Sequence, residues 1–335
     1  FPGQKFDYIL PNPPYGVDWK SYAKPLRDEA ARDGWAGRFG AGLPRISDGS
    51  LLFLQHMISK MKSGSRLGIV LSGSPLFSGA AESGESEIRR WIIESDLLEG
   101  IVALPEQMFY NTGISTYVWV LSNSKPASRA GSVALIDGRG EFAKMRKSLG
   151  DKRKFLPTGA IETLVRLYND LPDDDPRVKV MPNDRFGFQR LTVERPLRLH
   201  WEVTEAVIDL LADDGEAPAG LRAHIGTVFV TERELTAAIK SLLAPLTAAK
   251  KKAVLKAAAV RDPDADPVTK NGVTEPDPDL RDNENIPLPV GYLAMTDQQR
   301  TKALHLAGES HLREEIHPYV PDAWIDHNKT KIGYE

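Results

Sequence analysis

The sequence predicts an α/β fold, the second half of a doubly wound sheet, followed by a mostly helical C-terminal region. Short apolar runs typical of buried strands alternate with amphipathic stretches at helical spacing up to residue 137. We expect strands at residues 6–10, 66–72, 98–104 and 117–121, with a fifth at 133–137 that we place at the edge of the sheet. Strand, helix, strand, helix, strand, loop and strand is the order typical of a doubly wound sheet.

The first expected strand, which we take to be buried and apolar, runs directly into a rigid turn, Asn12-Pro13-Pro14-Tyr15. Its two prolines fix φ at about −65° and remove two amide donors, which leaves the carbonyls of Asn12 and Pro13 as acceptors. The Asn12 side chain adds another acceptor and Tyr15 a flat aromatic face, so the turn could hold a planar group that bears an NH₂, such as a flipped adenine. An ordinary Asn-Pro turn at the end of a strand would contain the same residues.

Residues 17–47, after this turn, show only a weak pattern, and we expect a long surface segment there. Long irregular loops beside active sites are often lids or binding loops. Its glycines Gly37, Gly40 and Gly42 follow no strand and open no obvious helix, which indicates a flexible loop rather than a nucleotide-binding loop.

Three amphipathic helices are expected among and after these strands. Apolar residues recur at helical spacing from an N-cap at Ser47 or Asp48 to a terminator at Gly64. A second helix covers residues 85–95, and a third begins at the capping residue Thr158 and runs to residue 168.

Residues 144–154 hold six basic residues and a single acid, Asp151. A charge run of this kind is most often a solvated loop. The alternative is an arm beside the turn that contacts DNA phosphates, which would position DNA without reading its sequence. The candidates for phosphate contacts are Lys144, Arg146, Lys147, Lys152, Arg153 and Lys154.

The C-terminal half is expected to be mainly helical. An acidic, proline-rich joint at 172–182 precedes a strand with one exposed face at 186–195. Helices follow at 204–211, 232–243 and 245–259.

The last of these helices carries a stripe of lysines at positions 250, 251, 252 and 256. Such a stripe is more often packed against its own chain than used as a nucleic-acid arm, and a helical subdomain that docks a partner would have the same pattern. Residues 262–284 are acidic and rich in proline, and form either a linker or an ordered excursion on the surface, before a helix at 296–306. We divide the chain into four parts, 1–145, 146–260, 261–285 and 286–335.

Composition limits the classes of function. The 335 residues are 41% hydrophobic and 27% charged, which is ordinary for a globular chain. The formal charge of −3 argues against a free-standing DNA binder, because non-specific affinity comes mainly from phosphate neutralisation. No apolar run approaches the roughly 20 residues of a spanning helix, and no signal-peptide pattern opens the chain, so we expect a cytoplasmic protein without a membrane partner.

Metal ligation is not predicted. The sequence has no cysteine, which excludes disulfides and thiolate sites. His305, His311 and His317 lie six residues apart and fit no single face of a helix, so we expect no metal site.

Several sequence blocks occur together with the proline turn. The blocks are Asn12-Pro13-Pro14-Tyr15, Asp48-Gly49-Ser50-Leu51-Leu52-Phe53, Leu67-Gly68-Ile69-Val70-Leu71, Leu104-Pro105-Glu106-Gln107-Met108-Phe109, Thr112-Gly113-Ile114-Ser115-Thr116 and Val320-Pro321-Asp322-Ala323-Trp324-Ile325-Asp326. With these blocks the chain resembles the modification subunit of type I restriction-modification systems, an adenine-N6 DNA methyltransferase, and specifically its C-terminal part. The sequence has Ser115 where members of that family usually have proline.

This resemblance implies a Rossmann-like sheet in which the strand at 117–121 inserts antiparallel beside its predecessor. It also implies S-adenosylmethionine as the methyl donor, and DNA, a specificity subunit and a restriction subunit as partners. In the family the glycine-rich cofactor loop precedes the proline turn, and this chain begins with Phe1 rather than methionine. We therefore expect a fragment that is inactive alone, with Asn12 as its cofactor-side residue.

The expected chemistry is direct methylation of an amino group by Asn12, Pro13, Pro14 and Tyr15. Acceptors on both amino hydrogens favour the pyramidal nitrogen of the transition state, and Tyr15 would stack on the flipped base. Methyltransferases that act on glutamine amides or RNA adenines contain the same turn, since any planar NH₂ suits it. A non-catalytic docking subunit with a vestigial turn is a further alternative.

Overall fold

The apolar runs predicted as strands pair into one mixed sheet of six strands, in the order β1-β2-β4-β3-β5-β8. β1 is parallel to β2, and β3 is parallel to β5. β4 inserts antiparallel between β2 and β3, so the predicted α/β class and the antiparallel position of this strand are confirmed. The strands are β1 (Phe6–Ile9), β2 (Met61–Ser72), β3 (Leu98–Ala103), β4 (Thr116–Ser122), β5 (Ser132–Asp137) and β8 (Val178–Pro182).

This computed structural model describes residues 3–110, 112–212 and 218–335, which form two units. The first unit comprises Phe1–Leu191, Asn285–Gly308 and Lys329–Glu335, and contains the six-stranded sheet. The second unit comprises Thr192–Glu284 and Glu309–Asn328. The four-part division drawn from composition stays a prediction.

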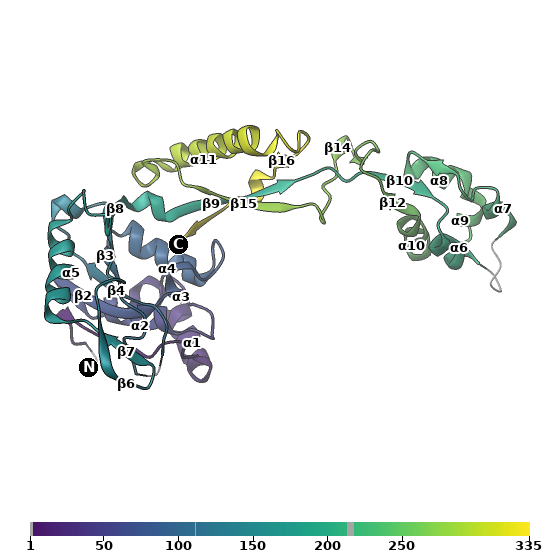
Figure 1. Cartoon of the computed structure of the whole chain (residues 1–335). Helices are drawn as coiled ribbons and strands as arrows, with labels where there is room; N and C mark the ends of the chain where they lie inside the picture. Colours follow the sequence, from purple (N-terminus) through teal and green to yellow (C-terminus); the bar gives the residue numbers. More distant parts are fainter. Residues whose placement is uncertain (1–2, 111, 213–217) are drawn as a thin grey trace. The chain divides into compact units, whose positions relative to one another are not determined.

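Helices cover both faces of the sheet. α2 (Ser50–Ser59) and α4 (Gly84–Glu94) pack on the face that presents Ile101. α5 (Thr158–Asp170) packs through Leu164 and Leu167 against Val102, the next residue of β3. Because successive side chains of a strand point to opposite faces, these helices lie on opposite sides of the sheet, as Figure 1 shows.

Helix α2 is shorter than its sequence pattern predicts. It ends at Ser59, and β2 begins at Met61, so Gly64 lies inside β2 with φ of +76° instead of ending the helix. The N-cap is Gly49, although the Asp48 carboxylate accepts from the Ser50 amide at 3.0 Å. Met61 is buried, and an apolar side chain at this position satisfies a helical pattern and a strand pattern equally well.

Strand β1 is not the buried strand that its apolar sequence predicts. It lies at the edge of the sheet, and Tyr8 and Leu10 are 77% and 85% exposed. An apolar run has the same appearance whether or not both its faces are covered, which is why the prediction was wrong.

Residues 17–47 contain a helix, which the weak pattern did not predict. α1 (Ala23–Asp33) follows a 3₁₀ turn, η1 (Lys20–Tyr22), and precedes a second, η2 (Gly34–Ala36). A separate small core formed by Trp19, Ala23, Phe39 and Leu52 holds this segment on α2. Charged residues outnumber apolar ones along α1, so its periodicity is weak.

The prediction that β5 is an edge strand was wrong, because β8 pairs antiparallel with it where an acidic joint was expected. The basic residues at 144–154 form a β-hairpin, β6 (Ala143–Leu149) and β7 (Lys152–Phe155). Short elements of the first unit are α3 (Ser74–Phe77), η3 (Ala127–Arg129), η4 (Asn183–Phe186) and η5 (Tyr292–Ala294).

Strand β9 (Gly187–Glu194) contributes to both units, and its last four residues are all buried rather than alternating with an exposed face. In the first unit β17 (Lys331–Tyr334) pairs with residues 187–190. In the second unit β16 (Trp324–Ile325) pairs with residues 193 and 194. β15 (Asp282–Pro287) belongs to the same sheet, and α11 (Asp297–His311) continues as a π-helical turn, Leu312–Ile316, followed by η7 (His327–Lys329).

The second unit folds around a small antiparallel sheet, β11-β10-β12. Figure 1 shows α6, α8, α9 and α10 gathered beside these strands. The predicted helices are present, although the one expected at 232–243 is broken into two, and α10 buries Val254 and Ala258. The elements are β10 (Leu199–Glu202), α6 (Glu205–Leu211), α7 (Ala219–Arg222), β11 (Val228–Phe229), α8 (Glu232–Ala238), α9 (Lys240–Leu243), α10 (Ala248–Ala258), β12 (Ala259–Arg261), β13 (Thr269–Lys270) and β14 (Val273–Thr274).

Within the described residues, no helix is both long and apolar enough to cross a membrane.

The start of α4 supplies a test of how the first unit packs. A Cβ on Gly84 would lie 1.8 Å from the Leu43 carbonyl oxygen, whereas a Cβ on Gly159, also in the first turn of a helix, would meet nothing within 4 Å. We predict that Gly84→Ala lowers the free energy of unfolding by about 2–3 kcal/mol, because main chain must move. Gly159→Ala should leave it unchanged or raise it by up to about 1 kcal/mol. Urea denaturation measures both, and equal effects would contradict the packing.

Candidate functional site

Three segments that are distant in sequence leave the sheet at one edge. β1, β2, β3 and β5 all run in the same direction, because β4 is antiparallel to both β2 and β3. The proline turn follows β1, the loop of residues 104–115 (the β3–β4 loop) follows β3, and the basic hairpin comes after β5. Ligands of open α/β sheets bind at this carboxyl edge.

The proline turn is held by β2 and by its own side chains. The Val70 amide of β2 donates to the Pro11 carbonyl at 3.3 Å. Asn12 is exposed and Pro13 is buried, and the Tyr15 hydroxyl donates to Asn12 Oδ1 at 3.0 Å. A carbonyl oxygen has two lone pairs, so Asn12 Oδ1 keeps one acceptor site for a further donor.

The Tyr15 ring contacts a second aromatic ring. Phe109 of the β3–β4 loop lies 5.7 Å from it between ring centroids, at 79° between the ring planes. Burial raises the pKa of Tyr15 to about 12, so its hydroxyl stays protonated and keeps donating to Asn12 near neutral pH. The sequence marks Phe109 only as part of a block, because nothing local connects it with a turn ninety-odd residues earlier.

The basic hairpin lies against the β3–β4 loop. The Arg153 and Lys154 amides both donate to the Gln107 carbonyl, at 3.0 and 3.2 Å, and the Asp151 amide donates to the Tyr110 carbonyl at 3.0 Å. Four of the six basic residues are exposed, whereas Lys152 and Lys154 are half-buried over the rings of Tyr110 and Phe142. The exposed four are Lys144, Arg146, Lys147 and Arg153.

The positive charge of the hairpin is not neutralised by any acidic side chain that the structure describes. Within the three described ranges, none of its six basic side chains forms an ion pair. The structure thus brings the predicted basic segment beside the predicted turn, with the β3–β4 loop between them.

A hollow of about 690 Å³ lies beside β1. Its lining is largely apolar, with Tyr8, Leu10 and Met57, and its polar members are Arg38, His56 and Lys60. Arg38 Nη1 lies 3.0 Å from His56 Nδ1, and burial with this nearby cation lowers the pKa of His56. The hollow is large enough for a nucleoside. Its described lining includes no carboxylate.

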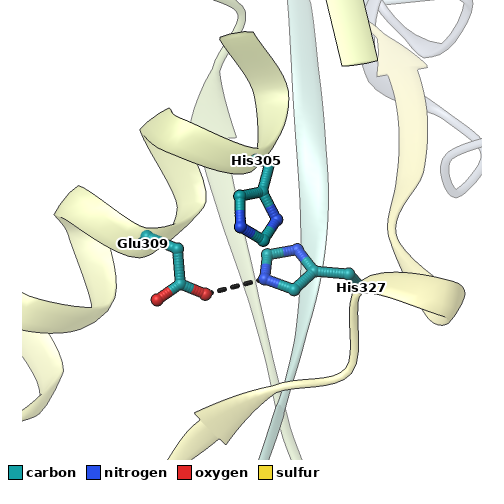
Figure 2. Close-up of side chains that lie close together, drawn as sticks. All are labelled: His305, Glu309 and His327. Atoms are coloured by element: carbon teal, nitrogen blue, oxygen red, sulfur yellow. Dashed lines mark hydrogen bonds and ion pairs between the residues drawn. The ribbon is translucent and has the colours of Figure 1, made fainter. Parts of the chain in front are cut away.

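The histidines near the C-terminus have partners within the protein. Glu309 Oε1 lies 2.7 Å from His327 Nε2. Figure 2 shows this pair, with His305 one helical turn before Glu309 on α11. Of the three histidines considered as metal ligands, His311 Nε2 lies 4.0 Å from the Glu284 carboxylate. His317 Nε2 lies 2.9 Å from the Ala323 carbonyl oxygen. His311 and His317 therefore have different neighbours, a carboxylate for His311 and a main-chain carbonyl for His317.

Two relatives of this chain are both methylase subunits of type I restriction enzymes. The methylase subunit of the type I restriction enzyme HindI from Haemophilus influenzae is 33% identical over 136 residues, which are 41% of this chain and 28% of that protein. The MjaIX methylase subunit from Methanocaldococcus jannaschii is 27% identical over 179 residues, 52% of this chain and 30% of that protein. The chain thus spans less than a third of the length of these relatives.

Among solved structures, a type I restriction-modification methyltransferase subunit from Streptococcus thermophilus matches with a TM-score of 0.46 at 25% identity, over 56% of this chain and 36% of that one.

A model of one protein family, described as N-6 DNA methylase, matches residues 2–185, which include the proline turn, the β3–β4 loop and the basic hairpin. The resemblance found from the sequence blocks is confirmed by this match and by the type I relatives. Since the match covers more than half of the sequence, the chain belongs to the N-6 DNA methylase family.

Proposed function

We propose that the protein to which this chain belongs is the modification subunit of a type I restriction-modification system, and that it transfers a methyl group to the exocyclic amino group of a flipped adenine in DNA. The observation that carries this proposal is the assembly at the carboxyl edge of the sheet. There the Asn12–Tyr15 hydrogen bond, the Phe109 ring and an unneutralised basic hairpin lie on three neighbouring segments. The proposed partners are DNA, a specificity subunit and a restriction subunit.

The turn contributes acceptors to the reaction. S-adenosylmethionine supplies an electrophilic methyl group when it is bound. Asn12 Oδ1 and the Pro13 carbonyl accept the two amino hydrogens of the base, which localises the nitrogen lone pair toward the methyl group. The Tyr15 hydroxyl holds the Asn12 amide in orientation. Asn12, Pro13, Pro14 and Tyr15 are therefore the proposed catalytic residues.

The aromatic residues hold the base. The Tyr15 ring offers its face for stacking, and Phe109, set nearly perpendicular to it, limits where the base can lie. Aromatic walls of this kind compensate for part of the cost of unstacking a base from the duplex. We assign the whole segment 1–145 to the methyltransferase part of the protein.

The hairpin favours nucleic acid over a protein glutamine as substrate. Its exposed cations are Lys144, Arg146, Lys147 and Arg153, and in this proposal they contact phosphates of the strand that carries the flipped nucleotide. A protein side chain would have no phosphates for these charges, and an RNA adenine is not favoured by a family whose model describes DNA methylases.

The isolated chain should be a poor methyltransferase. The hollow beside β1 offers no carboxylate for the donor's ribose, and the chain spans less than a third of its relatives. We predict no S-adenosylmethionine binding by this chain alone up to millimolar concentration in calorimetry. A micromolar dissociation constant would contradict this.

Asn12 tests the role of the turn. Asn12→Ala in the complete protein with its partner subunits should reduce the single-turnover methylation rate on the order of a hundredfold or more, since a bond that strengthens in the transition state is lost. Asn12→Asp should be less harmful because it still accepts, and Tyr15→Ala should be worse than Tyr15→Phe. Melting temperature should hardly change.

Asn123 is the matched control for Asn12. Its amide donates to the Lys62 carbonyl and accepts from the Ser65 amide, so its role is structural. Asn123→Ala should lower the melting temperature and leave the single-turnover rate of the folded fraction unchanged. If Asn12→Ala behaves in the same way as Asn123→Ala, the turn is structural and the proposal is wrong.

The hairpin tests the phosphate contacts. Replacing Arg146, Lys147 and Arg153 together by alanine should weaken DNA binding about equally for all sequences and reduce the slope of log K against log salt by about 2–3. The same charge change on α10, at Lys250, Lys252 and Lys256, serves as the control and should alter neither. Loss of discrimination between sites at unchanged non-specific affinity would contradict the assignment.

A further inference from the structure

The hairpin and the β3–β4 loop are joined by main chain rather than by ion pairs. Two hairpin amides, of Arg153 and Lys154, converge on the Gln107 carbonyl, and a third, of Asp151, reaches the Tyr110 carbonyl. The two acceptors flank Phe109, whose ring contacts Tyr15. The connection therefore ends at the wall of the proposed base pocket.

Two backbone conformations make this connection possible. Gln107 has φ of +61°, a left-handed conformation that a non-glycine residue keeps only where its surroundings hold it. Gly150, in the turn of the hairpin, has φ of +62°, and a Cβ there would lie 2.6 Å from the Tyr110 carbonyl oxygen. Because real Cβ atoms do not approach an oxygen so closely, the hairpin can close onto the loop only with glycine at this position.

A side chain also connects the hairpin to the β3–β4 loop. The Lys152 ammonium lies 4.9 Å from the centroid of the Tyr110 ring in the β3–β4 loop. The Lys154 ammonium lies 4.1 Å from the centroid of the Phe142 ring, which directly precedes β6, so this second contact stabilises the hairpin itself. A cation over an aromatic face is attracted to it, more strongly where water is partly excluded. The hairpin thus presents its exposed cations to solvent and holds the β3–β4 loop with the rest of its strand β7.

We infer that the β6–β7 hairpin is a positioning element that transmits phosphate binding to the base pocket through the Gln107 and Tyr110 carbonyls. When its exposed cations bind phosphates, the hairpin moves less, and the Gln107 and Tyr110 segments to which it is hydrogen-bonded move less with it, so that Phe109 is held more firmly in its contact with Tyr15. The aromatic wall that exists in the free protein is thus more rigid while DNA is held. Gly150 is the positioning residue of this link. The inference rests on the proposed function for its DNA step, but the link itself is a property of the free protein.

The free protein tests the link. Gly150→Ala in the complete protein should speed amide hydrogen exchange at Asp151, Arg153 and Lys154, since the added Cβ separates the hairpin from the loop. Gly131→Ala is the matched control, because Gly131 has a similar φ of +70° but a Cβ there would meet nothing within 4 Å. The melting temperature of both variants shows whether they fold. Exchange at these three amides that is equal in Gly150→Ala and Gly131→Ala would overturn the link.

Duplex DNA at low salt tests the transmission. Bound DNA should slow exchange in the hairpin and at Gln107 and Phe109 in the parent and in Gly131→Ala, but only in the hairpin in Gly150→Ala. The single-turnover methylation rate of Gly150→Ala should fall at least tenfold while its DNA dissociation constant changes less than threefold. Protection of the hairpin without protection of the β3–β4 loop in the parent would overturn the inference. If DNA protects no amide of the hairpin, the phosphate contacts of the proposed function are wrong, and the transmission to the base pocket is wrong with them. The hydrogen-bonded link between hairpin and loop is tested separately, by the exchange measurements on the free protein.

Discussion

The antiparallel insertion of β4 is the constraint on which the rest of the first unit depends. By pairing with both β2 and β3, it keeps these two strands parallel to each other although they are not neighbours. Its side chains Trp119 and Leu121 are almost fully buried and fill the core under α2 and α4. All four parallel strands consequently end at one edge, and the segments that follow β1, β3 and β5 meet there. The candidate site is a result of this topology more than of any single strong interaction.

The proline turn acquires its geometry from that arrangement. The Pro11 carbonyl, just before the turn, accepts a hydrogen bond from β2. The Tyr15 ring contacts a loop that begins at β3, three strands away from β1 in the sheet. The prolines restrict the main chain, and the Tyr15 hydroxyl restricts the Asn12 side chain. A site prepared in this way loses little conformational freedom when a substrate binds, which is the physical advantage of building it on rigid segments.

The sequence was sufficient for the parts of the fold that rest on local pattern. The strands β3, β4 and β5 and the helices α4, α5 and α6 lie close to where the sequence pattern predicts them, and β2 includes its predicted range, because an apolar run or an apolar helical face is a local signal. Prediction failed where burial depends on distant residues. The apolar run of β1 is the same whether the strand is central or at an edge of the sheet, so it does not predict that β1 is an edge strand. The many charged residues of α1 weaken its helical pattern, although a small core with Trp19 and Phe39 stabilises the helix. The β8 strand was missed because acidic residues precede it and its pairing with β5 is long-range.

The same division applies to the site. Asn12 to Tyr15 could be found because their residue types imply a chemistry on their own. Phe109 and the backbone link at Gln107 and Gly150 could not, since a ring contact and a shared carbonyl leave no local pattern. The six basic residues were visible as a charge run, but their hairpin conformation follows from hydrogen bonds to a loop that precedes them by more than thirty residues.

In the proposed function the turn receives an extruded adenine, which stacks against Tyr15. This can be tested by replacing the proposed target adenine by 2-aminopurine and following its fluorescence as the complete protein binds the DNA together with the proposed partner subunits. We expect the fluorescence to rise when the base leaves the stack, with the rise limited by quenching on the Tyr15 ring, and to rise clearly more with Tyr15→Ala. No rise on binding, or the same rise with and without the Tyr15 ring, would contradict it.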